Sequence, residues 1–120
     1  MSIRHFSLAS LLVVALGAAA CGASAPPTVQ MTKSQSAVRA AEEVGAQDTP
    51  KAALHLKMAR DHIKNAEALM VEEEYEDATL VLRRAEADAE LAIALSKEEK
   101  ARAEADTLMR KVQELKRDME

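Results

Sequence analysis

Three side chains with metal-binding atoms lie within one short stretch of the sequence: His55, Met58 and His62. On a helix the two histidines, seven residues apart, would share one face. Imidazole nitrogen and thioether sulfur are both ligands for transition metals. A closed metal site needs more ligands than this stretch offers. We therefore interpret these side chains as partly exposed helix residues and expect no metal site.

Residues for other chemistry are equally sparse. After Phe6, Tyr75 is the only aromatic residue, and the sequence contains no G-x-S-x-G, no Gly-rich phosphate loop and no H-E-x-x-H. Pockets for small molecules are normally lined by aromatic and large apolar groups. The acidic run Glu72–Glu74 cannot wrap a calcium ion with three consecutive residues, and we interpret it as a solvated turn plugged by Tyr75. We expect no catalytic residue, no cofactor and no small-molecule substrate.

The first 20 residues have the layout of a secretory signal peptide. Arg4 and His5 precede an apolar run from Phe6 to Leu16, and small residues follow that run. The run is much shorter than the roughly 20 residues that a transmembrane helix needs. We therefore assign residues 1–20 to a signal peptide.

Cys21, the only cysteine, directly follows this segment. The small residues and the cysteine resemble the lipobox of bacterial lipoproteins, in which the preceding peptide is removed and the thiol is diacylated. The resemblance implies that Cys21 is the lipidation site, although Ala18 stands where the family usually has leucine. The alternative is ordinary secretion after the A-x-A sequence ending at Ala20, with Cys21 as a free thiol. Gly22, in place of aspartate, resembles lipoproteins sent to the outer membrane of Gram-negative bacteria, where this protein would face the periplasm.

Without residues 1–20 the chain is mildly acidic, with 15 basic and 20 acidic side chains in 100 residues. No basic patch stands out, which argues against nucleic acid as a partner. The charge also gives no attraction to anionic lipid, so we expect membrane contact to come from the acyl chains alone.

The mature chain is predicted to be all-α. All glycines and prolines lie at or before position 50, and Lys51–Glu120 is dense in residues that favour helices. Residues 21–33 are predicted to form the lipidated N-terminus and an extended tether.

Local signals predict a short first helix after the tether. Ser34 or Ser36 would cap its start, and Gly45 would end it in the left-handed conformation. Thr49 and Pro50 have the types favoured just before and at the first position of the next helix.

A change in the phase of the apolar pattern predicts a helical hairpin within residues 34–96. The first apolar stripe consists of Ala52, Leu56, Ala59, Ile63, Ala66 and Met70. The second stripe consists of Tyr75, Ala78, Leu82, Ala85, Ala89 and Ala92. Acidic residues favour the first turn of a new helix, so we expect the hairpin turn at residues 72–74.

The last helix, from residue 75 to about 119, would be about 65 Å long. A further apolar line runs on its nearly opposite side: Leu80, Ala87, Leu91, Ala94, Ala101, Ala105, Leu108, Val112, Leu115 and Met119. We expect two other helices to flank the first half of this helix on these two sides. Residues 97–120 would overhang as a charged helix with coiled-coil spacing. The candidate interface consists of Leu108, Val112, Leu115 and Met119.

Two family resemblances cover the helical part. The segment EEEYEDATLVLRRAEADAELA resembles half of a tetratricopeptide repeat (TPR), without a second copy. Residues 37 to about 115 resemble a family of short helical bacterial envelope proteins, a domain of unknown function that is sometimes joined to an OmpA-like peptidoglycan-binding domain. This second resemblance rests on Gly45, Ala46, Pro50, Leu54 and Ala59, on Ala66, Tyr75 and Ala78, and on Ala85–Ala92. Members usually have glycine just before the tyrosine, where this chain has Glu73 and Glu74.

Two functions remain open at the level of sequence. The first is a lipid-anchored structural or adaptor protein of the cell envelope, whose last helix contacts a second copy or another envelope protein. The second is a TPR-like module that binds peptides in the periplasm. We favour the first, because the second needs polar side chains placed to grip a peptide and the helices offer mostly alanine.

Overall fold

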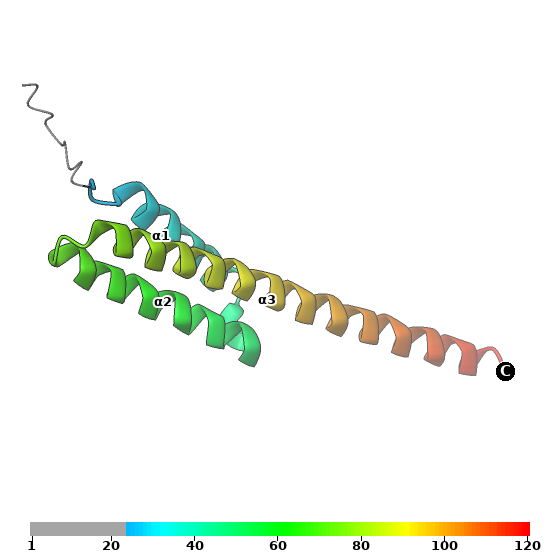
Figure 1. Ribbon diagram of the computed structural model, residues 1–120. Helices are drawn as coiled ribbons and strands as arrows, with labels where there is room; N and C mark the ends of the chain where they lie inside the picture. Colours follow the sequence, from blue (N-terminus) through cyan, green and yellow to red (C-terminus); the bar gives the residue numbers. More distant parts are fainter. Residues whose placement is uncertain (1–23) are drawn as a thin grey trace, which may run out of the picture.

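The computed structural model describes residues 24–120, so Cys21 and the predicted signal peptide lie outside the described residues. The elements are α1 (Thr28–Glu43), a short 3-10 helix η1 (Ala46–Asp48), α2 (Pro50–Val71) and α3 (Tyr75–Asp118). α2 and α3 form an antiparallel hairpin, α1 lies along the first half of α3, and the second half of α3 projects beyond both (Figure 1). Residues 24–120 contain no strand. The predicted all-α architecture, with a short first helix on a hairpin and a long overhanging last helix, is confirmed.

The connection between α1 and α2 follows the local signals in the sequence. Gly45 has a φ of 76°, and its N–H donates to the Glu42 carbonyl at 3.0 Å. A Cβ atom at this position would lie 2.9 Å from a carboxylate oxygen of Asp48, so only glycine fits here without strain. Thr49 occupies the position before α2 and Pro50 its first position. The predicted end of α1 and start of α2 are confirmed.

The turn between α2 and α3 occupies residues 72–74, as the phase change predicts. The N–H of Glu74 donates to the Leu69 carbonyl at 2.9 Å, and that of Glu73 to the Met70 carbonyl at 3.2 Å. These two bonds define a Schellman motif, in which the residue after the C-cap is left-handed. That residue is Glu73, with a φ of 62°. Its side chain makes this conformation unfavourable, because Cβ crowds the following carbonyl oxygen.

The start of α1 differs from the prediction. The helix begins at Thr28, so residues 28–33 are helical and do not belong to an extended tether, and neither Ser34 nor Ser36 caps the start. The early turns are held by tertiary contacts. Met31 packs against the cluster that contains Leu82, and Ser34, which is a residue of α1 and not its cap, is fully buried. Contacts with α3, which is distant in sequence, therefore extend α1 beyond what local signals indicate.

The core consists mainly of alanine. Both predicted stripes of the hairpin face it, although the longer side chains of Ile63, Met70 and Tyr75 are only partly buried. The fully or almost fully buried apolar residues are Val38, Ala41, Ala46, Ala52, Leu56, Ala59, Ala66, Ala78, Leu82, Ala85, Ala89 and Ala92. Methyl side chains let helix axes approach closely, so stability depends on many short-range contacts between helices.

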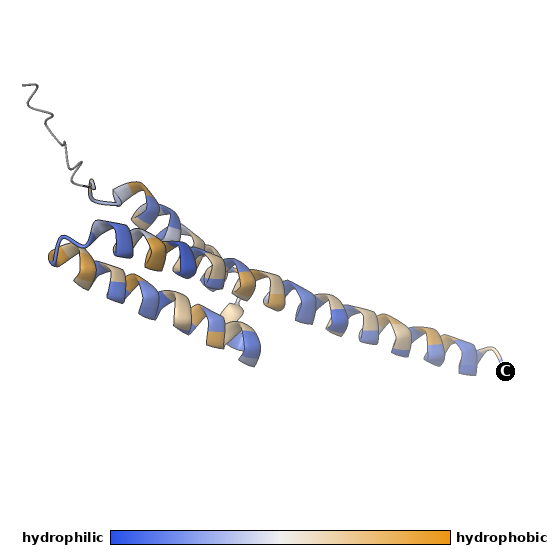
Figure 2. Cartoon of the chain, in the orientation of Figure 1, coloured by the Kyte–Doolittle hydropathy of each residue, from blue (hydrophilic) through white to orange (hydrophobic). Residues whose placement is uncertain are grey.

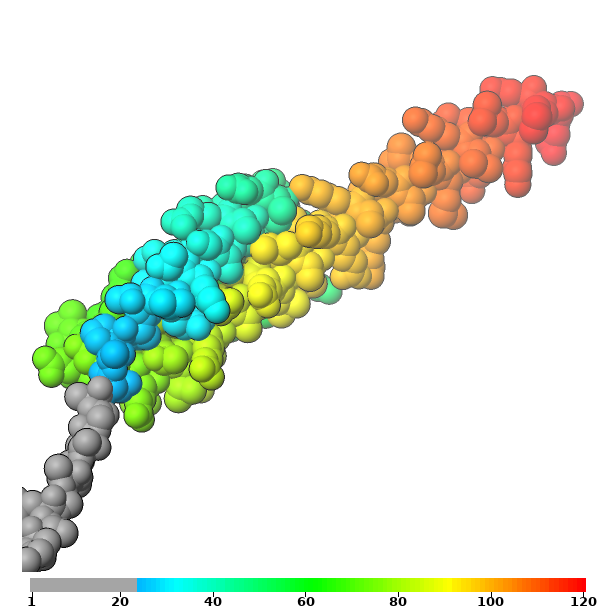
Figure 3. Space-filling view, turned by 90° about the horizontal axis from the view of Figure 1, so that it is seen from above, coloured from blue at the N-terminus to red at the C-terminus, as the bar shows by residue number. Residues whose placement is uncertain are grey.

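The arrangement around α3 corrects one prediction. We expected helices on two nearly opposite sides of its first half, but α1 and α2 pack on the same side. Leu80, Ala87, Leu91 and Ala94, on the other side, are exposed. Small residues on the covered side, with Ser96 completing the buried line, leave room for two helices there. The space-filling view shows α1 seated along α3, and the projecting half of α3 uncovered (Figure 3).

The strain at the hairpin turn predicts that Glu73→Gly stabilises the protein. Glycine adopts a positive φ without a Cβ clash, so we expect the free energy of unfolding to rise by about 1 kcal/mol. Thermal unfolding followed by circular dichroism measures this change as an increase in Tm of several degrees. Glu72→Gly is the matched control, because Glu72 has a φ of −83° and should gain nothing. Equal Tm values for the two variants would contradict the assignment of strain to Glu73.

Candidate functional site

An uncovered apolar stripe runs along the whole of α3. We define the α3 stripe by its alternating spacing of four and three residues: Leu80, Arg84, Ala87, Leu91, Ala94, Glu98, Ala101, Ala105, Leu108, Val112, Leu115 and Met119. At 100° per residue, the positions from Leu80 to Glu98 lie on the side of α3 opposite Ala78, Leu82 and Ala85, which face α1 and α2. A seven-residue repeat drifts by about 20° per heptad on a straight helix, so the later positions lie progressively towards one flank. The larger apolar residues of the stripe are between 43% and 79% exposed. Apolar (orange) and hydrophilic (blue) residues alternate along the helix in Figure 2.

The candidate interface predicted from the sequence lies on the projecting part of α3. Leu108, Val112, Leu115 and Met119 are 61%, 51%, 63% and 79% exposed. Every residue from position 97 to the C-terminus is exposed. The projecting helix therefore buries none of its apolar side chains within residues 24–120, and packing is what normally stabilises a helix of this length in water.

Polar contacts that the sequence did not indicate fix α1 on α3. The buried Ser34 hydroxyl lies 2.8 Å from the Leu82 carbonyl of α3, and 2.9 Å from the Gln30 carbonyl one turn earlier in α1. At the other end of α1, the Val44 carbonyl accepts from the buried Ser96 hydroxyl at 3.0 Å. Lys100 donates to the same carbonyl at 2.6 Å. Such contacts set the position of α1 along α3, because bare alanine surfaces specify it poorly.

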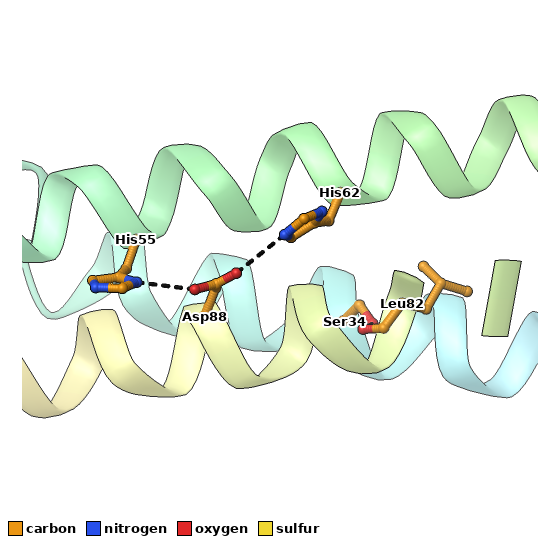
Figure 4. Close-up of polar contacts among 5 residues, drawn as sticks. All are labelled: Ser34, His55, His62, Leu82 and Asp88. Atoms are coloured by element: carbon orange, nitrogen blue, oxygen red, sulfur yellow. Dashed lines mark hydrogen bonds and ion pairs between the residues drawn. The ribbon is translucent and has the colours of Figure 1, made fainter. Parts of the chain in front are cut away.

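His55 and His62 meet a residue that the sequence analysis did not single out, Asp88 of α3 (Figure 4). His55 Nδ1 lies 2.9 Å from one carboxylate oxygen of Asp88, and His62 Nε2 lies 3.3 Å from the other. The side chains are 26%, 29% and 15% exposed in the order His55, His62, Asp88. One carboxylate is thus hydrogen-bonded to His55 and lies within ion-pair distance of His62, both on α2. Seven-residue spacing indicated the shared face, but only the pairing of α2 with α3 supplies the acceptor.

This histidine cluster is a contact between helices. In the part of the chain that the structure describes, no three His, Cys, Asp or Glu side chains are arranged to hold a metal ion. Both histidines are partly exposed helix residues, as predicted. The arrangement joins the middle of α2 to the first half of α3 through one hydrogen bond and one ion-pair contact.

The other residues that we considered for binding lie at the hairpin turn. Glu72–Glu74 are exposed, in line with a solvated turn, and Tyr75 is the partly buried first residue of α3. The Tyr75 carbonyl accepts from the Thr79 hydroxyl at 2.7 Å. Cys21, the predicted lipidation site, lies outside the described residues.

Comparisons with known proteins place the fold in a family context. The family model described as Domain of unknown function (DUF4398) matches residues 29–108, which cover α2, nearly all of α1, and α3 as far as Leu108. No curated protein and no solved structure matches the chain. Among residues 24–120, no helix combines the length and the hydropathy required to cross a bilayer.

The histidine cluster predicts that Asp88→Ala destabilises the hairpin. The change removes the hydrogen-bond partner of His55 and the carboxylate beside His62, and we expect a loss of about 1–2 kcal/mol in the free energy of unfolding. Urea unfolding at pH 6 measures it. Asp61→Ala is the matched control, because it brings the same change in helix propensity at an exposed position of α2.

The control residue also carries an ion pair. The hydrogen bond from Lys57, at 2.6 Å, lowers the pKa of Asp61, but both side chains are well exposed and solvent screens the pair. Asp61→Ala should therefore leave the unfolding midpoint nearly unchanged. A loss in Asp88→Ala no larger than in Asp61→Ala would show that the cluster contributes nothing to stability.

Proposed function

The chain belongs to the DUF4398 family, and we propose that it is a lipid-anchored adaptor protein of the bacterial cell envelope. It binds its partner through helix–helix contacts of α3. The observation that carries this proposal is the exposed α3 stripe. Contiguous exposed apolar surface marks sites of protein interaction. Apolar residues at alternating spacings of four and three are the pattern with which one helix packs against another in a coiled coil.

The geometry of α3 suits such a role. From Ala101 to Asp118 the helix projects by about 27 Å beyond Lys100, which contacts the end of α1. It is held at its base by the Ser96 and Lys100 contacts with the end of α1. A partner can therefore reach the projecting stripe from outside, and the hairpin beneath it need not open.

The anchor is proposed to be Cys21, on the sequence features described above. Because α1 begins at Thr28, the seven residue-to-residue steps from Cys21 to Thr28 can span at most about 25 Å. An acylated Cys21 would thus keep the start of α1 close to the membrane. Two acyl chains give stable attachment, whereas one chain gives only reversible binding.

Anchoring predicts that Cys21→Ser releases the protein from membranes or blocks its maturation. The serine hydroxyl cannot take the place of the thiol to be acylated, so we expect the variant in the soluble fraction or as the longer precursor. Phase partitioning in detergent, followed by immunoblotting through a C-terminal tag, separates these forms. Ser24→Ala is the matched control and should partition like the wild type. Identical partitioning of Cys21→Ser and wild type would rule out the lipid anchor.

The docking role predicts that Leu108→Glu combined with Leu115→Glu abolishes contacts of α3 while preserving the hairpin. Both residues are exposed and far from the core, so helicity and Tm should hardly change. A photo-crosslinking amino acid at Val112, in living cells, reports the contacts as adducts on a gel. Ala103→Glu with Gln113→Glu adds the same charge away from the α3 stripe and should keep the adducts. Unchanged adducts in the Leu108/Leu115 variant would contradict the proposal.

A further inference from the structure

The α3 stripe has the length and the regularity of a complete coiled-coil surface. Its spacing of four and three residues continues without a break from Leu80 to Met119, over more than five heptads. Only Arg84 and Glu98 interrupt its apolar character. Since α1 and α2 cover the opposite side of α3, a second long helix can lie along the whole stripe.

Charges beside the α3 stripe show which helix fits it. Every second residue of the α3 stripe, beginning with Arg84, is directly preceded by a charged residue. These preceding residues are seven positions apart, and their charges alternate between positive and negative: Arg83, Glu90, Lys97, Glu104, Lys111 and Asp118. We call these six residues the flanking charges. All are exposed, and none makes an ion pair or side-chain hydrogen bond within residues 24–120. Residues at this heptad position select the partner and the orientation of a coiled coil.

We propose that the α3 stripe pairs with the same stripe of a second copy in an antiparallel coiled coil centred between Glu99 and Lys100. This inference rests on the proposed function, because it names the partner of the same surface. In this register each flanking charge meets one of opposite sign from the other copy: Arg83 with Asp118, Glu90 with Lys111, and Lys97 with Glu104. Twofold symmetry forms each pair twice, and an isologous interface of this kind closes at the dimer.

The layers of the stripe agree with this register. Leu91 lies opposite Leu108 of the second copy, Ala94 opposite Ala105, and Ala87 opposite Val112, so apolar residues meet throughout these layers. Arg84 meets Leu115, along which its aliphatic stem can lie. Glu98 meets Ala101, and its carboxylate is already paired with Arg102 of its own chain at 2.5 Å. The polar positions therefore need no buried, unpaired charge.

Other arrangements are disfavoured by the same charges. A parallel pair in register would bring Lys97 beside Arg102, and Lys111 beside Lys116, of the second copy. An antiparallel pair centred half a heptad closer to the C-terminus would bring Glu104 beside Glu104 of the second copy. Like charges at these positions weaken a coiled coil. A shorter antiparallel register, centred near residue 106, pairs Glu104 with Lys111 but leaves Leu80–Leu91 uncovered.

Charge exchange at Lys97 and Glu104 tests the arrangement. Sedimentation of the full mature protein in a non-ionic detergent measures the dimer dissociation constant. Lys97→Glu and Glu104→Lys should each raise this constant about tenfold, since two symmetric attractions become repulsions. The double variant should restore it. Arg110→Glu, with the same charge change on the far side of α3, is the control and should have no effect.

The alternatives give different results in the same measurement. A tighter dimer for Lys97→Glu would indicate the parallel pair and overturn the proposal. A double variant weaker than either single variant would indicate the shorter register, in which Lys97 meets Asp118 and Glu104 meets Lys111, and would also overturn it. A strictly monomeric wild type would overturn any pairing of two copies.

Disulfide formation in the cell envelope gives an independent readout. Chains carrying Leu91→Cys and chains carrying Leu108→Cys, with different tags, are expressed together or separately and treated with a mild oxidant. The proposal expects disulfide-linked, mixed-tag dimers on co-expression and no disulfide-linked dimer of either variant expressed alone. The reason is that Leu91 lies about 25 Å from its own symmetry mate in the antiparallel pair. Wild type, with Cys21 alone, controls for the native cysteine. Crosslinking of Leu91→Cys by itself would overturn the proposal.

Failure of this inference differs from failure of the proposed function. If α3 docks on another envelope protein, the Val112 adducts form in the otherwise unchanged protein and are lost in the Leu108→Glu/Leu115→Glu variant, but none of them has the mass of a dimer. If α3 docks on nothing, no adduct forms at all.

Discussion

The small side chains on one side of α3 control how closely the three helices approach, and the remaining architecture depends on this approach. Ala78, Ala85, Ala89 and Ala92 are fully buried there, and they leave space for α1 and α2 to pack side by side. With larger residues the two helices would be forced apart around α3. Because both helices are accommodated on one side, the opposite side is left exposed.

A core of alanine has a second consequence. Each buried methyl contributes only about 0.8 kcal/mol, and alanine surfaces slide past each other with few penalties. The position of each helix along its neighbour therefore depends on a few polar contacts. Ser34 and Ser96 locate the two ends of α1 on α3, and Asp88 locates the middle of α2 through His55 and His62. In this small fold, polar groups specify the arrangement and methyl groups stabilise it.

Features encoded by neighbouring residues could be predicted from the sequence. Gly45, Thr49 and Pro50 act through their own backbone preferences, and the hairpin turn follows from the phase of apolar residues on either side. The start of α1 could not be found in this way, since no local signal separates Thr28 from Ser34. It depends on where residue 82, about 50 positions away, lies in space.

The candidate site also has features that local sequence predicts and features that depend on tertiary contacts. Periodicity identified Leu108, Val112, Leu115 and Met119 as one apolar line, and within residues 24–120 these side chains are exposed. Asp88 could not be identified from the sequence, because the pairing of α2 with α3 decides which of many carboxylates lies beside the histidines. The first half of the α3 stripe was assigned to a buried side, since periodicity identifies an apolar face without indicating which helix covers it.

The parallel course of α1 and α3 determines how the molecule would respond to mechanical load. The start of α1 lies near the hairpin turn, at the opposite end of the helical domain from the end of α3, as Figure 1 shows. A pull between these ends would slide α1 along α3, and would not peel the two helices apart from one end. Sliding strains the contacts of Ser34 and Ser96 at the same time, whereas peeling would break them one after the other. The alanine-rich seam between α1 and α3 is therefore oriented to transmit tension from the N-terminal end of the domain to the tip of its longest helix.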